Sequence, residues 1–186
     1  GFSVVSLCRL VLDPSKARDR ALLERFPSGL VAVKRMIRSA DNGEIASASP
    51  EISLRFEAAL LKSFDHANLV RSVGCLSSAK KADDASLAQE YLPGGSLKDK
   101  LTDLNYSTRE AFKWLVGIAR GLQYLHDIPR VYVVHRDLKP ENVMLSADGT
   151  AKLCDLGLAC LIPKADDAHG ESYATSAYAR ESATGA

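Results

Sequence analysis

One short stretch, residues 134–145, constrains this chain more than any other. It reads Val-His-Arg-Asp-Leu-Lys-Pro-Glu-Asn-Val-Met-Leu and places a carboxylate (Asp137), an ammonium (Lys139) and a carboxamide (Asn142) within six residues. Pro140 has no amide hydrogen and disfavours the helical conformation at the residue before it, so the stretch predicts an ordered loop between two apolar flanks. A base, a cation that can face phosphate and an oxygen ligand for a metal ion suit phosphoryl transfer.

The composition is typical of a globular protein of one domain or two small lobes, because 46% of the 186 residues are hydrophobic and 25% are charged. A net charge of +1 does not call for nucleic acid or an anionic membrane as a partner. The chain shows no apolar run near the length of about 20 residues that spans a membrane, and no signal-peptide pattern. The cysteines form no Cys-x-x-Cys pair, which favours free thiols in a reducing compartment. We therefore expect a soluble, intracellular, cytoplasmic protein.

Two segments upstream carry candidate functional residues. Residues 30–36 are β-branched and apolar and predict a strand, in which alternation places Ala32 and Lys34 on the same face. A small residue beside a lysine suits a surface that receives a flat base next to phosphates. Serine, proline and glutamate predict the start of a helix over about 50–64, and Glu57 lies between its apolar rows.

The intervening segments are less specific. Residues 21–24 fit either a helix or a strand. Residues 70–75 and 86–91 predict two strands around a polar turn at 77–84, and Gly94-Gly95 marks a boundary between two parts of the chain.

The clearest helix is predicted over 107–126, where a Ser-Thr-Arg-Glu capping box opens a regular apolar stripe that belongs in the core. Further on, Asp148-Gly149 between the apolar runs 143–145 and 151–154 predicts a β-hairpin. The hairpin leads to Asp155, a carboxylate that suits Mg²⁺.

In this order the motifs resemble those of the eukaryotic-type protein kinase family. The loop 135–142 resembles the catalytic loop H-R-D-L-x-x-x-N, residues 31–34 resemble V-A-I-K, and Asp155-Leu-Gly resembles D-F-G with Leu in place of Phe. Residues 89–97 resemble the hinge between the kinase lobes. Residues 1–7 fit a simple strand or the end of the glycine-rich loop.

The resemblance implies an α+β, bilobal fold, with a β-rich N-lobe that contains one helix over residues 1–91 and a mainly helical C-lobe over 92–186. We expect the chain to begin inside the glycine-rich loop and to be incomplete at both ends. Residues 175–178 resemble the T-x-x-Y of an activation loop, but A-P-E does not follow. The helices that normally complete the C-lobe are therefore expected to be missing.

The resemblance also implies transfer of the γ-phosphoryl group of ATP to Ser or Thr hydroxyls of proteins, with ATP and Mg²⁺ as cofactors. The kinase is expected to be of the serine/threonine type or tyrosine-kinase-like. The implied catalytic residues are Asp137 as base, Lys139 and Asn142, and the implied metal ligands are Asn142 and Asp155. The implied nucleotide-binding residues are Val5, Ala32, Lys34, Glu57, Gln89, Glu90, Leu92, Met144 and Asp155. The alternative is a catalytically silent nucleotide-binding or interaction module.

Overall fold

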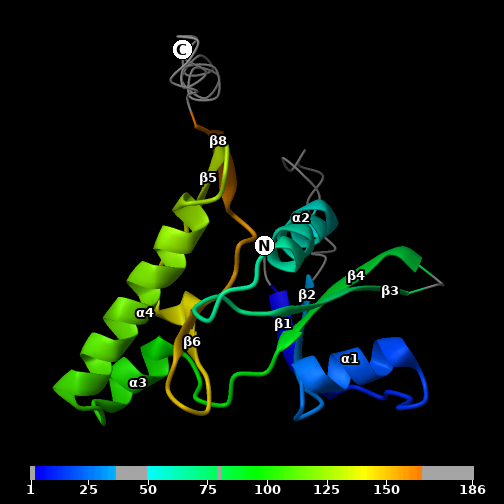
Figure 1. The fold of residues 1–186 in the computed structure, drawn as a ribbon, viewed down its shortest axis with the longest axis horizontal. Coiled ribbons are helices and arrows are strands. Elements are labelled where there is room, and N and C mark those ends of the chain that lie inside the picture. Colours follow the sequence, from blue (N-terminus) through cyan, green and yellow to red (C-terminus); the bar gives the residue numbers. More distant parts are fainter. Residues whose placement is uncertain (1–2, 37–49, 79–80, 165–186) are drawn as a thin grey trace, which may run out of the picture.

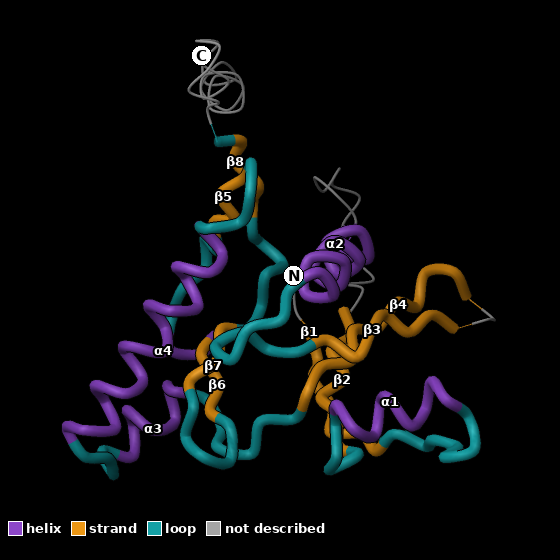
Figure 2. The backbone as a smooth tube through the Cα atoms, in the orientation of Figure 1, coloured by secondary structure: helices purple, strands orange, loops and turns teal. Residues whose placement is uncertain are grey.

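A computed structural model of the chain describes residues 3–36, 50–78 and 81–164. The helices and strands follow in the order β1 (Ser3–Arg9), α1 (Ala17–Arg25), β2 (Leu30–Met36), α2 (Pro50–Ser63), β3 (Ser72–Ser78), β4 (Lys81–Glu90), α3 (Leu97–Asp103), α4 (Thr108–His126), β5 (Val131–Val134), a 3-10 turn (Pro140–Asn142), β6 (Val143–Leu145), β7 (Ala151–Leu153) and β8 (Cys160–Pro163). In Figures 1 and 2 the β1–β4 sheet, α1 and α2 form one part of the molecule. The helices α3 and α4 and the strands β5–β8 form a second part beside it. The predicted α+β fold is thus confirmed, whereas the division at residues 91 and 92 stays a prediction.

The larger sheet has four antiparallel strands in the order β1-β2-β4-β3. Its second strand, β2, forms where the sequence predicts it, since β-branched side chains suit a pleated surface that is buried on one face. Val31 and Val33 are buried in a small cluster with Ala88 of β4, while Ala32 and Lys34 lie on the opposite face. This alternation places Lys34 on the face of the sheet opposite the small valine cluster, with 11% of its side chain exposed.

Two helices flank the core from opposite directions. In α2, Leu54 and Leu61 are fully buried, which explains why the predicted helix packs against the sheet. At the start of α4 the Ser107 side chain accepts from the Glu110 amide and the Glu110 side chain accepts from the Ser107 amide, as the predicted capping box requires. A large apolar cluster links α2 and β4 with α4 and the β6–β7 hairpin into one continuous core.

Several parts of the secondary structure differ from expectation or were left open by the sequence, and the helix α3 was not predicted. Residues 21–24 belong to the helix α1, none of whose residues is buried. The predicted turn over 77–84 is wrong, because pairing of β3 with β4 continues to Ser78 and Lys81. The pairing of β5 with β8 was not predicted, and Figure 2 shows these strands side by side beyond the end of α4.

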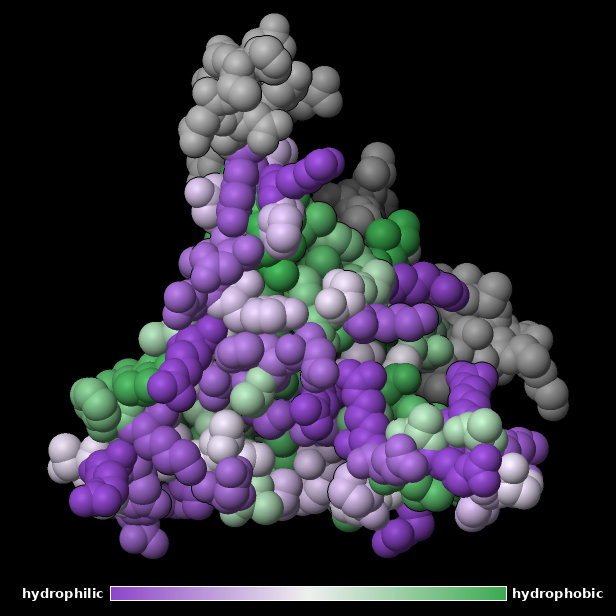
Figure 3. Space-filling model, viewed as in Figure 1, coloured by the Kyte–Doolittle hydropathy of each residue, from purple (hydrophilic) through white to green (hydrophobic). Residues whose placement is uncertain are grey.

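In the view of Figure 3, hydrophilic side chains cover much of the surface along α4, beside hydrophobic areas. Two apolar side chains of α4, Phe112 and Leu115, are largely exposed.

Within the described residues, every helix is too short or too polar to cross a membrane. The predicted T-x-x-Y segment at 175–178 lies outside the described residues.

Candidate active site

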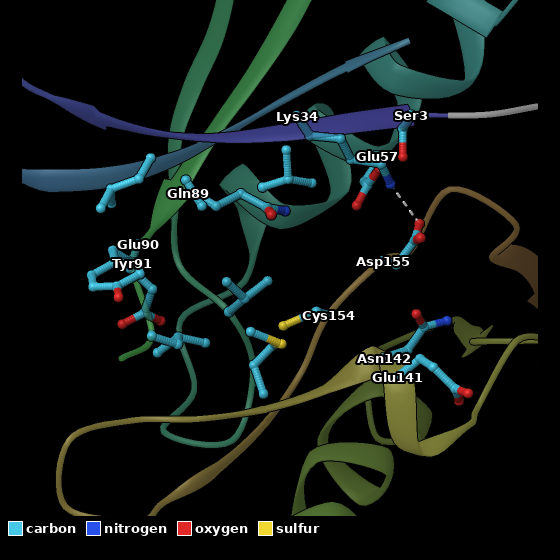
Figure 4. Close-up of a pocket in the computed structure, with 16 residues that line it drawn as sticks. Ser3, Lys34, Glu57, Gln89, Glu90, Tyr91, Glu141, Asn142, Cys154 and Asp155 are labelled. Carbon is cyan, nitrogen blue, oxygen red and sulfur yellow. Dashed lines mark hydrogen bonds and ion pairs between the residues drawn. The ribbon is translucent and has the colours of Figure 1, made fainter. Parts of the chain in front are cut away.

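The predicted nucleotide-binding residues gather around one cavity of about 420 Å³, between the β1–β4 sheet and the β6–β7 hairpin (Figure 4). Those that line it are Val5, Ala32, Lys34, Glu57, Gln89, Glu90, Leu92, Met144 and Asp155, together with the predicted metal ligand Asn142. They come from β1, β2, α2, the end of β4, the linker after β4, the strand β6 and the segments on either side of the β6–β7 hairpin. Residues far apart in the sequence thus meet in one space that can hold a small ligand.

Lys34 lies between two carboxylates in this cavity. Its Nζ donates to Glu57 Oε2 at 2.9 Å and to Asp155 Oδ1 at 2.7 Å, and Glu57 is only 1% exposed. Burial opposes the charge on Lys34, but the charges of Glu57 and Asp155 outweigh this effect and raise the pKa of the lysine. Burial also raises the pKa of Glu57, and the Lys34 ammonium offsets part of that rise. Lys34 is therefore a fixed positive charge at neutral pH.

The backbone at Asp155 is held in an unusual conformation. Asp155 has φ of 60°, in the left-handed region that non-glycine residues rarely occupy. Its Oδ1 accepts from the Gly157 amide at 3.3 Å, and the Gly157 carbonyl oxygen accepts from the Ser53 hydroxyl of α2 at 2.9 Å. These bonds tie the segment after β7 to α2. They aim the Asp155 carboxylate at Lys34, as Figure 4 shows.

The predicted catalytic residues form a compact hydrogen-bonded group. Lys139 Nζ donates to both carboxylate oxygens of Asp137, at 2.8 and 3.0 Å. Asn142 Nδ2 donates to Asp137 Oδ2 and to the Asp137 carbonyl oxygen, each at 2.8 Å. The hydrogen bonds from Lys139 and Asn142 lower the pKa of Asp137, so this side chain is a carboxylate at neutral pH.

The buried His135 side chain holds this loop through hydrogen bonds to the backbone. This side chain is almost completely buried, and its Nε2 lies 2.9 Å from the Cys154 carbonyl oxygen, while its Nδ1 accepts from the Asp137 amide at 3.3 Å. Since Nδ1 accepts, Nε2 carries the hydrogen and donates to Cys154. A neutral histidine thus joins the backbone of the loop directly to the residue before Asp155.

The oxygen atoms of Asp155 and Asn142 fit a Mg²⁺ ion, which prefers few protein oxygens and completes its shell with phosphate and water. Lys34 and Gly157 both contact Oδ1 of Asp155, which leaves Oδ2 for a ligand. The amide nitrogen of Asn142 is directed to Asp137, which leaves its side-chain oxygen. The described residues contain no group of three or more His, Cys, Asp or Glu side chains that could hold a metal alone. A metal ion bound here would therefore also need oxygen ligands from phosphate groups.

Gln89 also suits a polar ligand, because its buried Nε2 has no hydrogen-bond partner among the described residues. A buried donor without a partner is costly, so a ligand or a water molecule that accepts from it would be favoured.

Several residues that line the cavity were not predicted as site residues: Ser3, Leu7, Val70, Tyr91, Glu141 and Cys154. Two unpredicted residues, Cys154 and the nearby Lys152, have contacts that bear on the site. Cys154 lines the cavity, its thiol donates to the Lys152 carbonyl oxygen at 3.6 Å, and burial raises its pKa to about 12. Lys152 forms an ion pair with Glu90. The sequence gives no local signal for either, because both side chains depend on the packing of the hairpin against β4.

Sequence comparisons with known proteins show the family of the chain. The sequence profile described as "Protein kinase domain" matches residues 22–181. Cysteine-rich receptor-like protein kinase 6 of Oryza sativa subsp. japonica is 41% identical over 136 residues, which cover 69% of this chain and 18% of that protein. Leucine-rich repeat receptor-like protein kinase TDR of Arabidopsis thaliana is 35% identical over 145 residues, or 74% of this chain and 13% of that protein.

Probable serine/threonine-protein kinase PBL25 of Arabidopsis thaliana is 35% identical over 159 residues, which cover 82% of this chain and 39% of that protein. The chain thus matches between 13% and 39% of the length of these three relatives. With the profile matched over most of its length, the chain belongs to the protein kinase domain family.

Proposed function

We propose that this domain transfers the γ-phosphoryl group of Mg-ATP to serine or threonine hydroxyls of protein substrates. One observation carries the proposal: Lys34, Glu57 and Asp155 form ion pairs inside one cavity although they come from separate segments. The Asp137–Lys139–Asn142 group adjoins this cavity through Asn142, which lines it. Loose phosphoryl-transfer transition states are stabilised mainly by positioning and by charge, and the cavity offers both.

In this proposal Asp137 orients the substrate hydroxyl and accepts its proton. Because the pKa of Asp137 is lowered, its carboxylate is a weak base. It contributes by orienting the substrate hydroxyl and by accepting the proton late in the phosphoryl transfer. Lys139 lies within hydrogen-bond distance of Asp137 and can turn toward the transferred phosphoryl group, since nearly half of its side chain is exposed. Asn142 holds Asp137 in place through its amide nitrogen.

The nucleotide would be held by residues on both sides of the cavity. Lys34, fixed by Glu57, would bind the α- and β-phosphates. Ala32 and Met144 would contact the faces of the base, and the backbone of the linker at Glu90 and Leu92 would bind its edge. Asp155 and Asn142 would hold Mg²⁺, which neutralises charge on the phosphates when bound. Arg136, whose Nε donates to the Leu158 carbonyl oxygen, would pair with a phosphorylated residue of the activation segment.

The serine/threonine class is supported by Lys139, which is typical of that class at this position, and by the printed names of relatives such as PBL25 and PBL21 of Arabidopsis thaliana.

The test replaces Asp137 with Asn. Phosphoryl transfer to a serine-containing peptide, measured with radiolabelled ATP, is expected to fall by a factor of about 10² to 10⁴. Affinity for Mg-ATP, measured by calorimetry, should stay within a factor of about two, because Asp137 does not line the cavity. Asp103→Asn, at the exposed end of α3, is the control and should transfer at the wild-type rate.

Undiminished transfer by Asp137→Asn would contradict the role of Asp137. A wild-type protein that binds Mg-ATP and transfers nothing would instead identify a silent nucleotide-binding module.

A further inference from the structure

A largely buried ion pair lies at the start of the linker between β4 and α3. Lys152 Nζ of β7 donates to Glu90 Oε1 at 2.8 Å, and only 10% and 17% of the two side chains are exposed. The same oxygen accepts from the Arg71 amide at 2.7 Å, and the Glu90 amide donates to the Arg71 carbonyl oxygen at 2.9 Å. Glu90, the last residue of β4, is thus held through both its side chain and its backbone.

The β6–β7 hairpin, which carries Lys152, also holds the other end of the linker. The Gly94 amide donates to the Leu145 carbonyl oxygen, and the Leu145 amide donates to the Gly95 carbonyl oxygen, each at 2.9 Å. A Cβ atom on Gly94 would lie 2.7 Å from that Leu145 oxygen, so only glycine permits this approach. Leu145 and Lys152 lie on the paired strands β6 and β7. The hairpin therefore fixes the linker at two points, Glu90 and Gly94.

Between these points the linker borders the cavity. Tyr91 and Leu92 both line it, and Leu92 is 6% exposed. Adenine and guanine differ at the edge that such a backbone would contact, since adenine carries an amino donor where guanine carries a carbonyl acceptor. Hydrogen bonds weaken steeply when they are misaligned, so discrimination between the two bases requires the linker to be held within a fraction of an ångström.

We propose that Lys152, acting through Glu90, is a positioning residue that sets the preference of the cavity for adenine over guanine nucleotides. The inference rests on the proposed function, because it takes the cavity as a nucleotide site. Lys152 does not line the cavity, so its effect on a nucleotide would pass through Glu90. It neutralises and holds the Glu90 carboxylate, and without it a buried charge is left with one backbone donor and is drawn toward water, which displaces the linker.

The test measures the dissociation constants of Mg-ATP and Mg-GTP by calorimetry in the wild-type protein and in variants. The readout is the ratio of the two constants. A variant that is only partly folded loses affinity for both nucleotides by the same factor, so its ratio does not change. A merely structural role of Lys152 would therefore leave the ratio at the wild-type value.

In Lys152→Met the preference for ATP is expected to fall by about tenfold, the equivalent of one well-aligned hydrogen bond. Lys152→Arg keeps the charge and should retain the preference within about threefold. The matched control is Lys16→Met, which removes an exposed lysine whose Nζ lies 3.8 Å from Asp13 Oδ2. This variant should leave the ratio unchanged.

An unchanged ratio in Lys152→Met overturns the proposal, and so does an equal fall in Lys16→Met. If Lys152→Met does not fold, Lys152→Gln, which also leaves the Glu90 carboxylate without a cation, is measured instead. A lowered ratio in that variant supports the proposal, and a wild-type ratio overturns it. A wild-type protein that binds both nucleotides equally contradicts this inference alone, whereas one that binds neither contradicts the proposed function too.

Discussion

Lys34 is shared by two acids from opposite sides of the cavity, and this sharing determines what its removal would do. Only 1% of the Glu57 side chain is exposed, whereas about 40% of the Asp155 side chain is exposed. Loss of the ammonium would therefore destabilise the folded protein mainly through Glu57 and much less through Asp155. An isolated carboxylate is costly when it is buried and is not costly when it is exposed.

We predict that Lys34→Met lowers the free energy of unfolding by about 3 kcal/mol at pH 7 and that this deficit shrinks at pH 5. The pKa of Glu57 is already raised by burial, and loss of Lys34 removes the charge that opposes this rise. Below the raised pKa the carboxyl group is neutral in the folded protein, so the penalty for burying its charge disappears as the pH falls. Urea unfolding at the two pH values measures the effect.

The double variant Lys34→Met with Glu57→Gln is the control, since it has no carboxylate to protonate there. An equal deficit for Lys34→Met at both pH values would show that the cost comes from lost packing and not from charge.

The resemblance to protein kinases implies that Lys34 and Glu57 both belong to the nucleotide site, and the structure places Lys34 Nζ in contact with Glu57 Oε2. The direct contact of Lys34 with Asp155 was not predicted, because Asp155 was assigned to metal and its position depends on how the hairpin docks below the sheet. Motifs identify residue types in order along the chain. They do not encode which of several carboxylates meets a given lysine.

At the scale of elements, α4 approaches β7 and the loop after α2 through two glycines one turn apart. A Cβ atom on Gly117 would lie 2.9 Å from Asn68 Nδ2, and one on Gly121 would lie 2.9 Å from the Asn68 carbonyl oxygen and 3.0 Å from Leu153 Cδ1. These contacts are tighter than side chains tolerate, so the helix can dock only where it carries no side chain.

We predict that Gly121→Ala destabilises the protein, although alanine favours a helix over glycine by about 1 kcal/mol. The new methyl group meets a backbone oxygen, which cannot move out of the way as a flexible side chain would. Ala119→Gly, on the exposed side of α4, should cost about 1 kcal/mol through helix propensity alone. Thermal unfolding of both variants separates docking from propensity, and a stabilised Gly121→Ala would contradict the close approach.

The turn of the β6–β7 hairpin depends on a carboxylate that titrates at low pH. Asp148 accepts hydrogen bonds from Ser146 and Thr150, and these lower its pKa to about 2. A lowered pKa means that the stabilisation is complete above the ordinary value of 3.8 and is lost as the pH falls toward 2.

We therefore predict that Asp148→Ala lowers the stability at pH 7 by at most about 1 kcal/mol, since solvent screens this exposed side chain. The difference from the wild-type protein should vanish near pH 2, as measured by chemical unfolding across this range. A difference that stays constant with pH would show that the turn does not depend on the charge of Asp148.

Element types were largely predictable, whereas their pairings and limits were not. The capping box at Ser107 has glutamate at its third position and was recognised, but that of α3 pairs Ser96 with Asp99 and was missed, because aspartate is less typical there. The polar residues at 77–84 suggested a turn, yet strand pairing overrides their low strand propensity. The β5–β8 pair joins Val131 to Pro163, a separation over which sequence patterns give no register.

At the scale of the whole molecule, a nucleotide in the cavity would join the sheet to the hairpin below it. We predict that Mg-ATP at 100 times its dissociation constant stabilises the wild-type protein by about 2.7 kcal/mol, seen as a rise in melting temperature. Asp137→Asn should show the same rise, because Asp137 does not line the cavity. Lys34→Met should show almost none, and an equal rise in that variant would contradict the binding role of Lys34.

Cys154 lines the cavity directly before Asp155, and its pKa of about 12 has a practical consequence. Alkylating reagents and peroxides attack the thiolate form, which is almost absent at neutral pH for such a thiol. Cys75 on β3, also a free cysteine, is exposed. A fluorescent label could thus be attached at Cys75 while the cavity stays unmodified, which would give binding studies a reporter outside the nucleotide site.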